Sequence, residues 1–571
     1  MLKLATVFSG IGAIEHALER MNIEYKIIFA SDNGDINIFE KKIPISLISI
    51  KREIKNLEDE IENLEFDETE LKILSHLQKV KESFNDILGQ MNNQYNFSIN
   101  LDYNIFISYI EKYKLSDSKI GNVLKLYDKD EEIYDLDKLI ILEVMRKKAE
   151  KAKISDIDII TEYNYLTEDK IFKKFKSITK EIIDNIIMLY EKIGTIKVRL
   201  NLDKLSTYKE KKQYIDNLYK DKNKSNYVKK SYFANYDIEE ENFHWNVCFI
   251  DGKQYKDNID LFVGGSPCQS FSAVGKQRGL QDTRGTLFYE YARLVKEIQP
   301  KVFIYENVRA VLSNDNGQTW EVMQNVFDEV GYNWKLMVLN AKDYGIPQNR
   351  ERIFVVGFRK DIILEEEFEE PKKIELEKTM KNYLIDNVSG KYYLNDKGVK
   401  FVTDEKNLQK RWTQIDGDIQ LCQKKNQQFN WHGDFVFEEE NKNKEKTIED
   451  LKKYFLSEKV RKYVLSSGTG KFYSRPEIDL DVARPLLTTM HKMHRAGIDN
   501  YVTTDGRIRK LTPRECLRLM GFCDSFKIVV SDTQAYQQAG NSIVVNVLVE
   551  IMKKIIKSLP EIRNGEGYKF K

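Results

Sequence analysis

Short apolar runs of strand length, separated by segments long enough for helices, constrain the fold of this chain most strongly. The first run covers residues 2–8 and is followed by a glycine turn, a helical pattern and a second run at residues 27–30. Near residue 246 the same order resumes, with apolar runs at residues 259–263, 302–305, 336–339 and 353–356. Segments such as 288–298 and 320–330 can cross between parallel strands. The pattern predicts an α/β fold with a doubly wound parallel sheet, built from two separated parts of the chain.

The segment between these parts, residues 40–227, has a different character. Lys, Glu, Asp, Ile, Leu and Asn dominate it, and glycine is sparse. Ile54, Leu57, Ile61 and Leu64 are spaced so that they share one side of a helix, but the pattern ends too early for a coiled coil. We therefore expect a helical hairpin or bundle. We interpret it as a structural appendage, and a role in dimerisation or in gripping a partner stays open.

Composition and charge exclude several classes of protein. The 571 residues carry a formal net charge of +1, so the chain lacks an overall basic balance, although residues 461–510 hold ten Lys or Arg against five Asp or Glu. No apolar stretch approaches the about 18 residues that span a bilayer, and the N-terminus lacks a secretory pattern, so we expect a cytoplasmic protein. The five cysteines have no C-x-x-C spacing, so we expect neither a disulfide framework nor a metal site.

The first apolar run leads into a turn with the spacing of a nucleoside-binding site. Its residues are Phe8, Gly10, Ile11 and Gly12. Asp32 lies 20 residues after Gly12, where the next strand ends, and could accept hydrogen bonds from ribose hydroxyls. Glu15 replaces the third glycine of a dinucleotide fingerprint, a loss that a cofactor without a pyrophosphate tolerates. Taken alone, the pattern also fits a simple tight turn.

A cysteine on a loop rich in glycine is the second chemical feature. The segment from Gly264 to Ser272 contains Cys268 and follows the run at residues 259–263, at the strand end where open α/β sheets bind ligands. An ionised thiol is a good nucleophile, and the glycines together with Pro267 would hold the sulfur on an exposed loop. The pattern therefore predicts a nucleophilic cysteine.

Pro267-Cys268-Gln269 after a double glycine resembles the catalytic loop of the C5-cytosine-specific DNA methyltransferases. Further elements similar to those of that family occur in the expected order: Tyr305 to Val308, Gln348-Asn349-Arg350-Glu351-Arg352, residues 484–489 and 511–516, and Ala539 to Val544. The resemblance covers residues 1–36 and about 228–360 and 480–555, and the long insert is not part of it.

The resemblance implies a Rossmann-like S-adenosylmethionine-dependent methyltransferase fold with a helical insert and a smaller, irregular α+β target-recognition domain. The expected parts are residues 1–39, 228–360 and 511–571 for the catalytic domain, 40–227 for the insert and 361–510 for the recognition domain. Base-reading side chains are expected within residues 361–480, where the sequence does not identify them.

The resemblance also implies which residue carries out each part of the reaction. The thiolate of Cys268 would attack carbon 6 of cytosine, because carbon 5 is a poor nucleophile until the ring is activated. Glu306 would hydrogen-bond the exocyclic amine and share a proton with ring nitrogen 3, which requires a raised pKa. Arg352, with Arg350 in the same motif, would offset negative charge at the ring carbonyl. Carbon 5 would then take a methyl group from S-adenosylmethionine.

Two further groups of residues are expected around this centre. The cofactor group consists of Phe8, Gly10, Ile11, Gly12, Asp32, Asn33, Pro267, Asn541 and Val544. The DNA group consists of Gln269, Ser270, Arg278, Arg284 and Gln348. The acid that the family offers to the cofactor's adenine has no clear counterpart, since alignment on Trp245 selects Asn246 and spacing selects Asp251. Because Asn33 stands where the family commonly has a bulky residue, Phe8 is expected to stack on the adenine.

The expected partner is duplex DNA, with the target nucleotide swung into the pocket at an unstacking cost of a few kcal/mol. A monomer acting in a bacterial or phage restriction system, beside a cognate endonuclease, is a further expectation from the resemblance. Two alternatives stay open. One is a tRNA cytosine-5 methyltransferase, against which the long variable region argues. The other is a catalytically silent DNA-binding regulator, against which Cys268, Glu306 and Arg352 argue.

Overall fold

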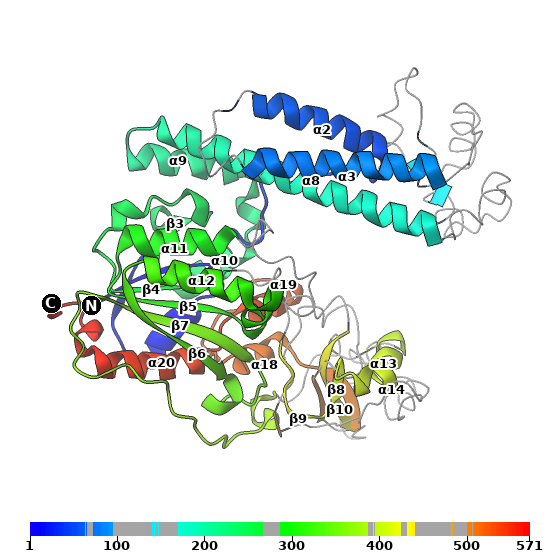
Figure 1. Cartoon of the computed structure of the whole chain (residues 1–571). Coiled ribbons are helices and arrows are strands. Elements are labelled where there is room, and N and C mark those ends of the chain that lie inside the picture. The colour runs from blue at the N-terminus through cyan, green and yellow to red at the C-terminus, as the bar shows by residue number, and fades with distance from the viewer. Residues whose placement is uncertain are drawn as a thin grey trace. The chain divides into compact units, whose positions relative to one another are not determined.

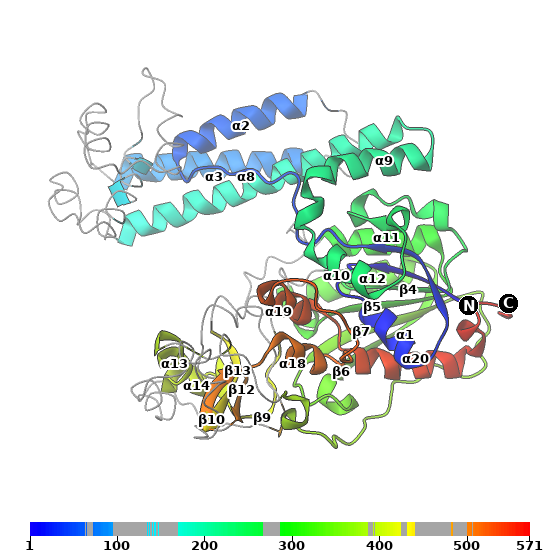
Figure 2. The same cartoon turned by 180° about the vertical axis from the view of Figure 1, so that it is seen from behind.

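The computed structural model of the chain forms two compact units, residues 1–36 with 206–571 and residues 37–205 (Figures 1 and 2). The residues it describes are 1–62, 64, 72–94, 134, 136–137, 140, 142–143, 147, 170–266, 286–385, 392, 394, 396–423, 431–439, 481–482, 500–504 and 506–571. Residues 206–227, which we expected within the insert, belong to the larger unit.

The larger unit is built on a sheet of seven strands in the order β3-β2-β1-β4-β5-β7-β6. In chain order they are β1 (Leu2–Val7), β2 (Tyr25–Ser31), β3 (Phe243–His244), β4 (Leu261–Gly264), β5 (Val302–Val308), β6 (Tyr332–Asn340) and β7 (Glu351–Arg359). The five neighbouring strands β3, β2, β1, β4 and β5 pair in parallel. The sheet confirms the predicted α/β fold, and each predicted apolar run overlaps one of its strands.

β7 corrects the prediction of an all-parallel sheet. It runs antiparallel to both β5 and β6. Only residues 341–350 separate β6 from β7, whereas a parallel connection needs a crossover of about a dozen residues or more. β7 therefore folds back between β6 and β5, and this reversal brings its first residues to the carboxyl end of β5.

Helices cover both faces of the sheet (Figures 1 and 2). α1 (Ala13–Arg20) and α20 (Val545–Ser558) share one core with Val302 and Ile304 of β5. α11 (Thr286–Ile298) and α12 (Gln318–Glu329) share the other core with Phe303 and Tyr305. This alternation is expected of a strand that is covered on both sides.

Two helices follow the smaller unit in the chain and belong to the larger one, α9 (Tyr208–Tyr219) and α10 (Tyr227–Asn235). The side chain of Asn226 caps α10 by accepting a hydrogen bond from the N–H of Lys229 (2.8 Å). Its amide also donates to the carbonyl oxygen of Asp32 (3.0 Å). The start of α10 is thereby fixed beside the end of β2.

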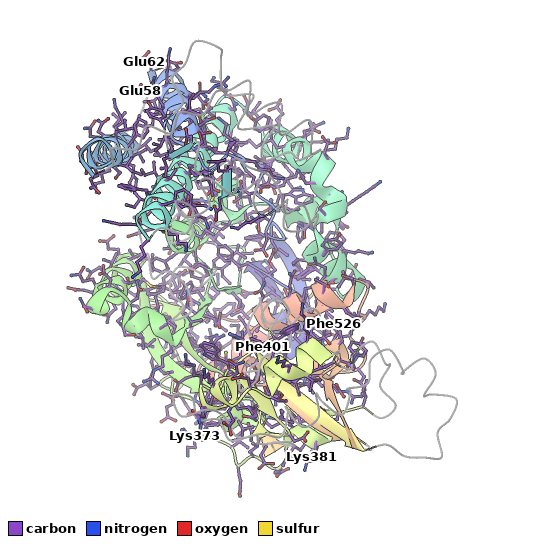
Figure 3. The ribbon with its side chains drawn as sticks, turned by 90° about the vertical axis from the view of Figure 1, so that its right-hand side faces the viewer. Glu58, Glu62, Lys373, Lys381, Phe401 and Phe526 are labelled. Carbon is purple, nitrogen blue, oxygen red and sulfur yellow. The ribbon has the colours of Figure 1, made fainter. Side chains whose placement is uncertain are left out.

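A smaller sheet lies in the region predicted to be the recognition domain. Its order is β12-β13-β10-β8, with β8 (Thr413–Ile415), β10 (Gly433–Glu439), β12 (Asn500–Thr504) and β13 (Gly506–Lys510); β9 (Asp418–Ile419) pairs separately with β11 (Asp481–Val482). α13 (Asp396–Val402) and α14 (Glu405–Gln409) precede it, and α18 (Pro513–Arg518) and α19 (Asp532–Asn541) lead back to α20. The ring of Phe401 in α13 lies 5.4 Å from that of Trp431 (Figure 3).

Among the described residues of the smaller unit, three long helices, α2 (Leu47–Glu62), α3 (Lys72–Gln94) and α8 (Lys170–Asp203), surround their own hydrophobic core. Ile54, Leu57 and Ile61 of the predicted seam are buried in this core. The carboxylate of Asp137 caps α2 by accepting from the N–H of Leu47 (2.6 Å). In the described ranges, no helix is both long and apolar enough to cross a membrane.

Candidate active site

Four loops meet at one edge of the large sheet, because β1, β2, β4 and β5 run parallel and end there. The loops after β1, β2 and β4 carry the glycine turn, Asp32 and Gly265, and Glu306 lies near the end of β5 itself. β7 begins at the same edge, since Arg352 pairs with Val308 across the antiparallel ladder. The fold thus gathers residues that are far apart in the sequence.

The glycine turn is held to Asp32 by backbone hydrogen bonds. The N–H of Gly10 donates to one carboxylate oxygen (2.9 Å), and the N–H of Gly34 donates to the other (2.8 Å). Phe8 and Gly10 both have positive φ angles, 53° and 55°. Among the described atoms, a Cβ on Gly10 would meet only the carbonyl oxygen of Phe8, at 3.9 Å, so a ligand could approach this backbone closely.

Other residues of the expected cofactor group have structural tasks. The side chain of Ile11 is buried in the core, so only its backbone belongs to the turn surface. Asn33 shapes the turn after β2, because its Oδ1 accepts from the N–H of Asp35 (3.1 Å). Val544 is buried in the same core as Ile11, whereas Asn541 ends α19 and is exposed.

Close backbone packing explains the double glycine that precedes the predicted nucleophile. A Cβ on Gly264 would lie 2.7 Å from Cγ2 of Val7. On Gly265 it would lie 2.7 Å from the carbonyl oxygen of Glu306 and 2.9 Å from Oε2 of that side chain. The end of β4 can therefore pack against Val7, and the loop after it against Glu306, only if Gly264 and Gly265 respectively lack a side chain.

Glu306 and Arg352 form an ion pair at the end of β5 and the start of β7. Nε of Arg352 lies 3.2 Å from Oε1 of Glu306, and each side chain is only 14% exposed. Burial raises the pKa of Glu306 above its ordinary value, while the charges of Arg352 and Arg350 oppose that rise. The pair offers a carboxyl group that can carry a proton, with a cation beside it.

A buried polar cluster that the sequence did not reveal supports the loop after β4. The hydroxyls of Ser266 and Tyr305 lie 2.7 Å apart, and the amide of Asn307 donates to the Tyr305 oxygen (2.7 Å). The same amide lies 3.3 Å from the hydroxyl of Ser266. Asn307 belongs to the Glu-Asn-Val motif, which was the available signal for this role.

Arg350, predicted to be catalytic, binds backbone carbonyl groups. One terminal nitrogen donates to the carbonyl of Gln423 (2.8 Å), and the other donates to those of Gly540 (3.1 Å) and Ser542 (2.9 Å). These bonds tie the start of β7 to the end of α19. In this structure Arg350 therefore holds the backbone at the start of β7 in position, next to the ion pair.

Gln348 requires a correction, because we expected it to contact DNA. Its side chain is fully buried, and its amide donates to the carbonyl oxygen of Leu519 (2.7 Å). Gln348 lies two residues before Arg350 in the motif, and both side chains donate hydrogen bonds to backbone carbonyl groups.

The other predicted site residues lie outside the described residues. They are Pro267, Cys268, Gln269, Ser270, Arg278 and Arg284. Within the described part of the chain, no group of three or more His, Cys, Asp or Glu side chains could hold a metal ion.

Asn246 and Asp251, the two candidates for the adenine contact, lie in different surroundings. Asn246 follows β3, which pairs with β2, whereas Asp251 begins a turn whose Gly252 N–H donates to Glu297 of α11 (2.9 Å). The amide of Asn246 already donates to the hydroxyl of Tyr219 (3.1 Å).

The glycine turn, the acid after the second strand and the ion pair at one edge of the sheet are compatible with a methyltransferase that uses a donor of the S-adenosylmethionine type. The profile of the family described as C-5 cytosine-specific DNA methylase matches residues 185–557, more than half of the chain. The chain belongs to this family, as predicted, and is a DNA (cytosine-5-)-methyltransferase.

Two relatives named as methyltransferases agree with this assignment. The orphan methyltransferase M.SPRI of Bacillus phage SPR is 31% identical over 398 residues, which cover 58% of this chain and 90% of that protein. The type II methyltransferase M.HhaI of Haemophilus parahaemolyticus is 34% identical over 306 residues, covering 52% and 76%. The solved methyltransferase EhMeth of Entamoeba histolytica aligns with a TM-score of 0.37 at 18% identity, covering 58% of this chain and 86% of that one.

Proposed function

We propose that this enzyme transfers a methyl group from S-adenosylmethionine to carbon 5 of a cytosine swung out of duplex DNA, through a covalent adduct with Cys268. The ion pair of Glu306 and Arg352 carries the proposal. It lies at the ligand-binding edge of the sheet and against Gly265, three residues before Cys268. A carboxyl group and a guanidinium match the amine, ring nitrogen and carbonyl along the polar edge of cytosine.

In the first step the thiolate sulfur of Cys268 adds to carbon 6, and the electron pair of the double bond between carbons 5 and 6 makes carbon 5 nucleophilic. When bound, S-adenosylmethionine would supply an electrophilic methyl group to carbon 5, with cleavage of the methyl–sulfur bond and release of the neutral thioether S-adenosylhomocysteine. A base then removes the proton from carbon 5, the carbon–sulfur bond breaks, and the ring double bond and the thiolate are restored.

Glu306 and Arg352 act on the polar edge of the ring during the addition. A protonated Glu306 shares its proton with ring nitrogen 3 and accepts a hydrogen bond from the exocyclic amine. The guanidinium of Arg352 offsets the negative charge that develops at the ring carbonyl. Arg350 is a positioning residue, because it fixes the backbone from which Arg352 projects.

The residues at the ends of β1 and β2 fit the methyl donor. The open backbone at Gly10 admits close approach of a ligand, and the carboxylate of Asp32, fixed by two backbone N–H groups, can accept from ribose hydroxyls. Phe8, at the edge of the turn, is assigned to stacking on the adenine. Asn246, Asn541, Val544 and Pro267 complete the proposed surroundings of the donor.

The DNA would be gripped by the loop after Cys268, through Gln269, Ser270, Arg278 and Arg284, and read by the smaller sheet and its neighbours in residues 361–510. Such residue types position phosphates and read base edges. The name of one relative, the type II methyltransferase M.HhaI, supports a place in a restriction system, whereas the phage relative is named an orphan methyltransferase. That context, the cognate endonuclease, the cytoplasmic monomer and the domain boundaries stay predictions.

The test is methyl transfer from labelled donor to duplex DNA and to tRNA in parallel, followed by bisulfite sequencing of the DNA. We expect label only in DNA, at cytosines of one sequence context, and none with Cys268→Ala. Label in tRNA alone would support the tRNA alternative. Sequence-specific DNA binding without any transfer would support the silent regulator.

A further inference from the structure

A buried acid beneath the glycine turn has no part in the chemistry above. Glu15 lies in the first turn of α1, three residues after Gly12, and its side chain is completely buried. A carboxyl group in such a place is costly unless it is neutral or well hydrogen-bonded. The hydrogen bonds around Glu15 therefore affect the conformation of the adjacent glycine turn.

Hydroxyl groups connect Glu15 with the glycine turn and with β2. The hydroxyl of Tyr232 in α10 donates to Oε1 of Glu15, and the hydroxyl oxygen of Thr6 lies 3.2 Å from the same oxygen. Thr6 also lies 2.7 Å from the hydroxyl of Ser9, which donates to the carbonyl oxygen of Ser31 (3.2 Å). Because the Ser9 hydrogen goes to Ser31, the single hydroxyl hydrogen of Thr6 has two acceptors within reach, Oε1 of Glu15 and the oxygen of Ser9, the residue that precedes Gly10.

The helix α10 supports the same turn by a second contact. The hydroxyl of Tyr236 donates to the carbonyl oxygen of Gly12 (2.7 Å), and a Cβ on Gly12 would lie 2.1 Å from the Tyr236 ring. Asn226 at the start of α10 binds the carbonyl of Asp32. α10 therefore touches both halves of the proposed donor site, and Tyr232 links it to Glu15.

The burial of Glu15 favours its neutral form. Within the described residues its Oε2 accepts no hydrogen bond, and a proton there removes the cost of a buried charge. Burial raises the pKa of Glu15 to about 7. The titratable groups that face it are Glu19 on its own helix, Tyr25 on β2, Tyr232 on α10, and Tyr236 directly after α10.

We infer that Glu15, with Tyr232, is a positioning pair for the methyl-donor turn, and that loss of the proton from Glu15 weakens donor binding. An ionised Glu15 recruits the hydroxyl hydrogen of Thr6, which the neutral acid leaves available to Ser9. It also places an uncompensated charge in the contact between α1 and α10. Both changes loosen the turn. The inference rests on the proposed donor site.

Equilibrium binding of two probes, S-adenosylmethionine and its demethylated product S-adenosylhomocysteine, tests it between pH 6.5 and 8.5. For the native chain we expect Kd to rise about fivefold for both probes, within the limit of about tenfold per pH unit that one linked proton allows. Glu15→Gln imitates the neutral acid and should bind with a Kd that hardly changes with pH. Tyr25→Phe, which removes a hydroxyl bound to Glu19 (3.3 Å), is the matched control and should behave as the native chain.

The two probes distinguish a role of Glu15 in positioning the turn from direct electrostatic attraction between an ionised Glu15 and the ligand. Only the methyl donor carries a positive sulfonium charge, so direct attraction would affect the donor alone. Equal pH dependence for both, lost in Glu15→Gln, supports the inference. Pronounced pH dependence that persists in Glu15→Gln, or tighter binding of the donor alone at high pH, overturns it. Absence of binding by the native chain at any pH, or binding unaffected by Asp32→Ala, would instead refute the proposed donor site.

Thermal unfolding gives a readout that needs no ligand. The pKa of Glu15 is raised in the folded state, so the folded chain binds the extra proton between the ordinary pKa and about 7. Stability from this group is therefore lost as the pH rises through that window. Glu15→Gln should unfold at a higher temperature than the native chain at pH 8.5. Tyr232→Phe should unfold at a lower temperature and weaken both probes.

Discussion

At the scale of single residues, the balance between burial and charge at Glu306 decides what the site can do. Burial raises its pKa, and the guanidinium 3.2 Å away opposes that rise. The carboxyl group can therefore be protonated at a pH where an exposed glutamate is ionised, while remaining close to a cation.

Glu306→Gln tests this role. The amide keeps the shape and can bind the cytosine edge, but it cannot give up a proton, so we expect the rate of methyl transfer to fall about 10²–10⁴-fold. The native rate should decline as the pH rises through the raised pKa of Glu306, because the protonated form is active. This decline should be missing in the variant. Rates from single-turnover assays across pH check both points, and a variant with native rate and pH profile would contradict the role.

Replacing Arg350 or Arg352 by alanine should distinguish the role of Arg350 in stability from the role of Arg352 in methyl transfer. Arg350→Ala leaves three backbone carbonyls without their donor and should cost about 3 kcal/mol of stability, measured by denaturant unfolding. Arg352→Ala should lower the transfer rate by at least about 10²-fold with a smaller loss of stability. Equal losses of stability and activity in the two variants would remove the distinction between them.

At the scale of elements, the loop after β4 depends on the absence of a side chain at Gly265. Gly265→Ala would press a methyl group against the backbone of Glu306 and displace the loop that leads to Cys268. We expect transfer activity to fall about 100-fold or more, since misplacement of a reacting group by about 1 Å has an effect of this size.

Gly89→Ala is the control for that substitution. Gly89 lies within α3, and in the structure an added Cβ there meets no atom within 4 Å. Activity should be unchanged, and helix stability should rise by up to about 1 kcal/mol. The account of the loop would be wrong if Gly265→Ala and Gly89→Ala were equally active.

Much of this element order was predictable from sequence. The strands β1, β2, β4 and β5 were visible because strands covered on both faces form continuous apolar runs. β3 was not, since two residues carry no periodic signal. The reversal of β7 follows from the short connection after β6, which the apolar pattern alone does not encode. Gln348 was misjudged because a polar residue in a DNA-enzyme motif suggests a ligand contact, whereas this one binds backbone. Glu15 was noted only as a missing glycine.

At the scale of the whole molecule, the chain consists of two units with separate hydrophobic cores. Separate cores predict separate folding. Replacing residues 37–205 by a short Gly/Ser linker should leave a folded larger unit that methylates DNA at a rate within about threefold of the full chain, as expected of an appendage.

Two outcomes of deleting the insert would show that it has a function of its own. A product that folds, by its cooperative thermal transition, but neither binds nor methylates DNA would assign the insert to gripping the partner. A product that no longer dimerises, where the full chain does in sedimentation, would assign it to assembly. Either result would contradict the interpretation as an appendage.

The covalent step is tested most directly by trapping. DNA in which cytosine is replaced by 5-fluorocytosine cannot release the proton that elimination requires, so the adduct should persist. With the methyl donor present, we expect a complex that survives denaturing electrophoresis, carries the label of the methyl group and maps to a peptide containing Cys268. Cys268→Ala should form none. If the native enzyme methylates ordinary DNA but leaves no stable complex with the fluorinated DNA, the covalent mechanism is wrong.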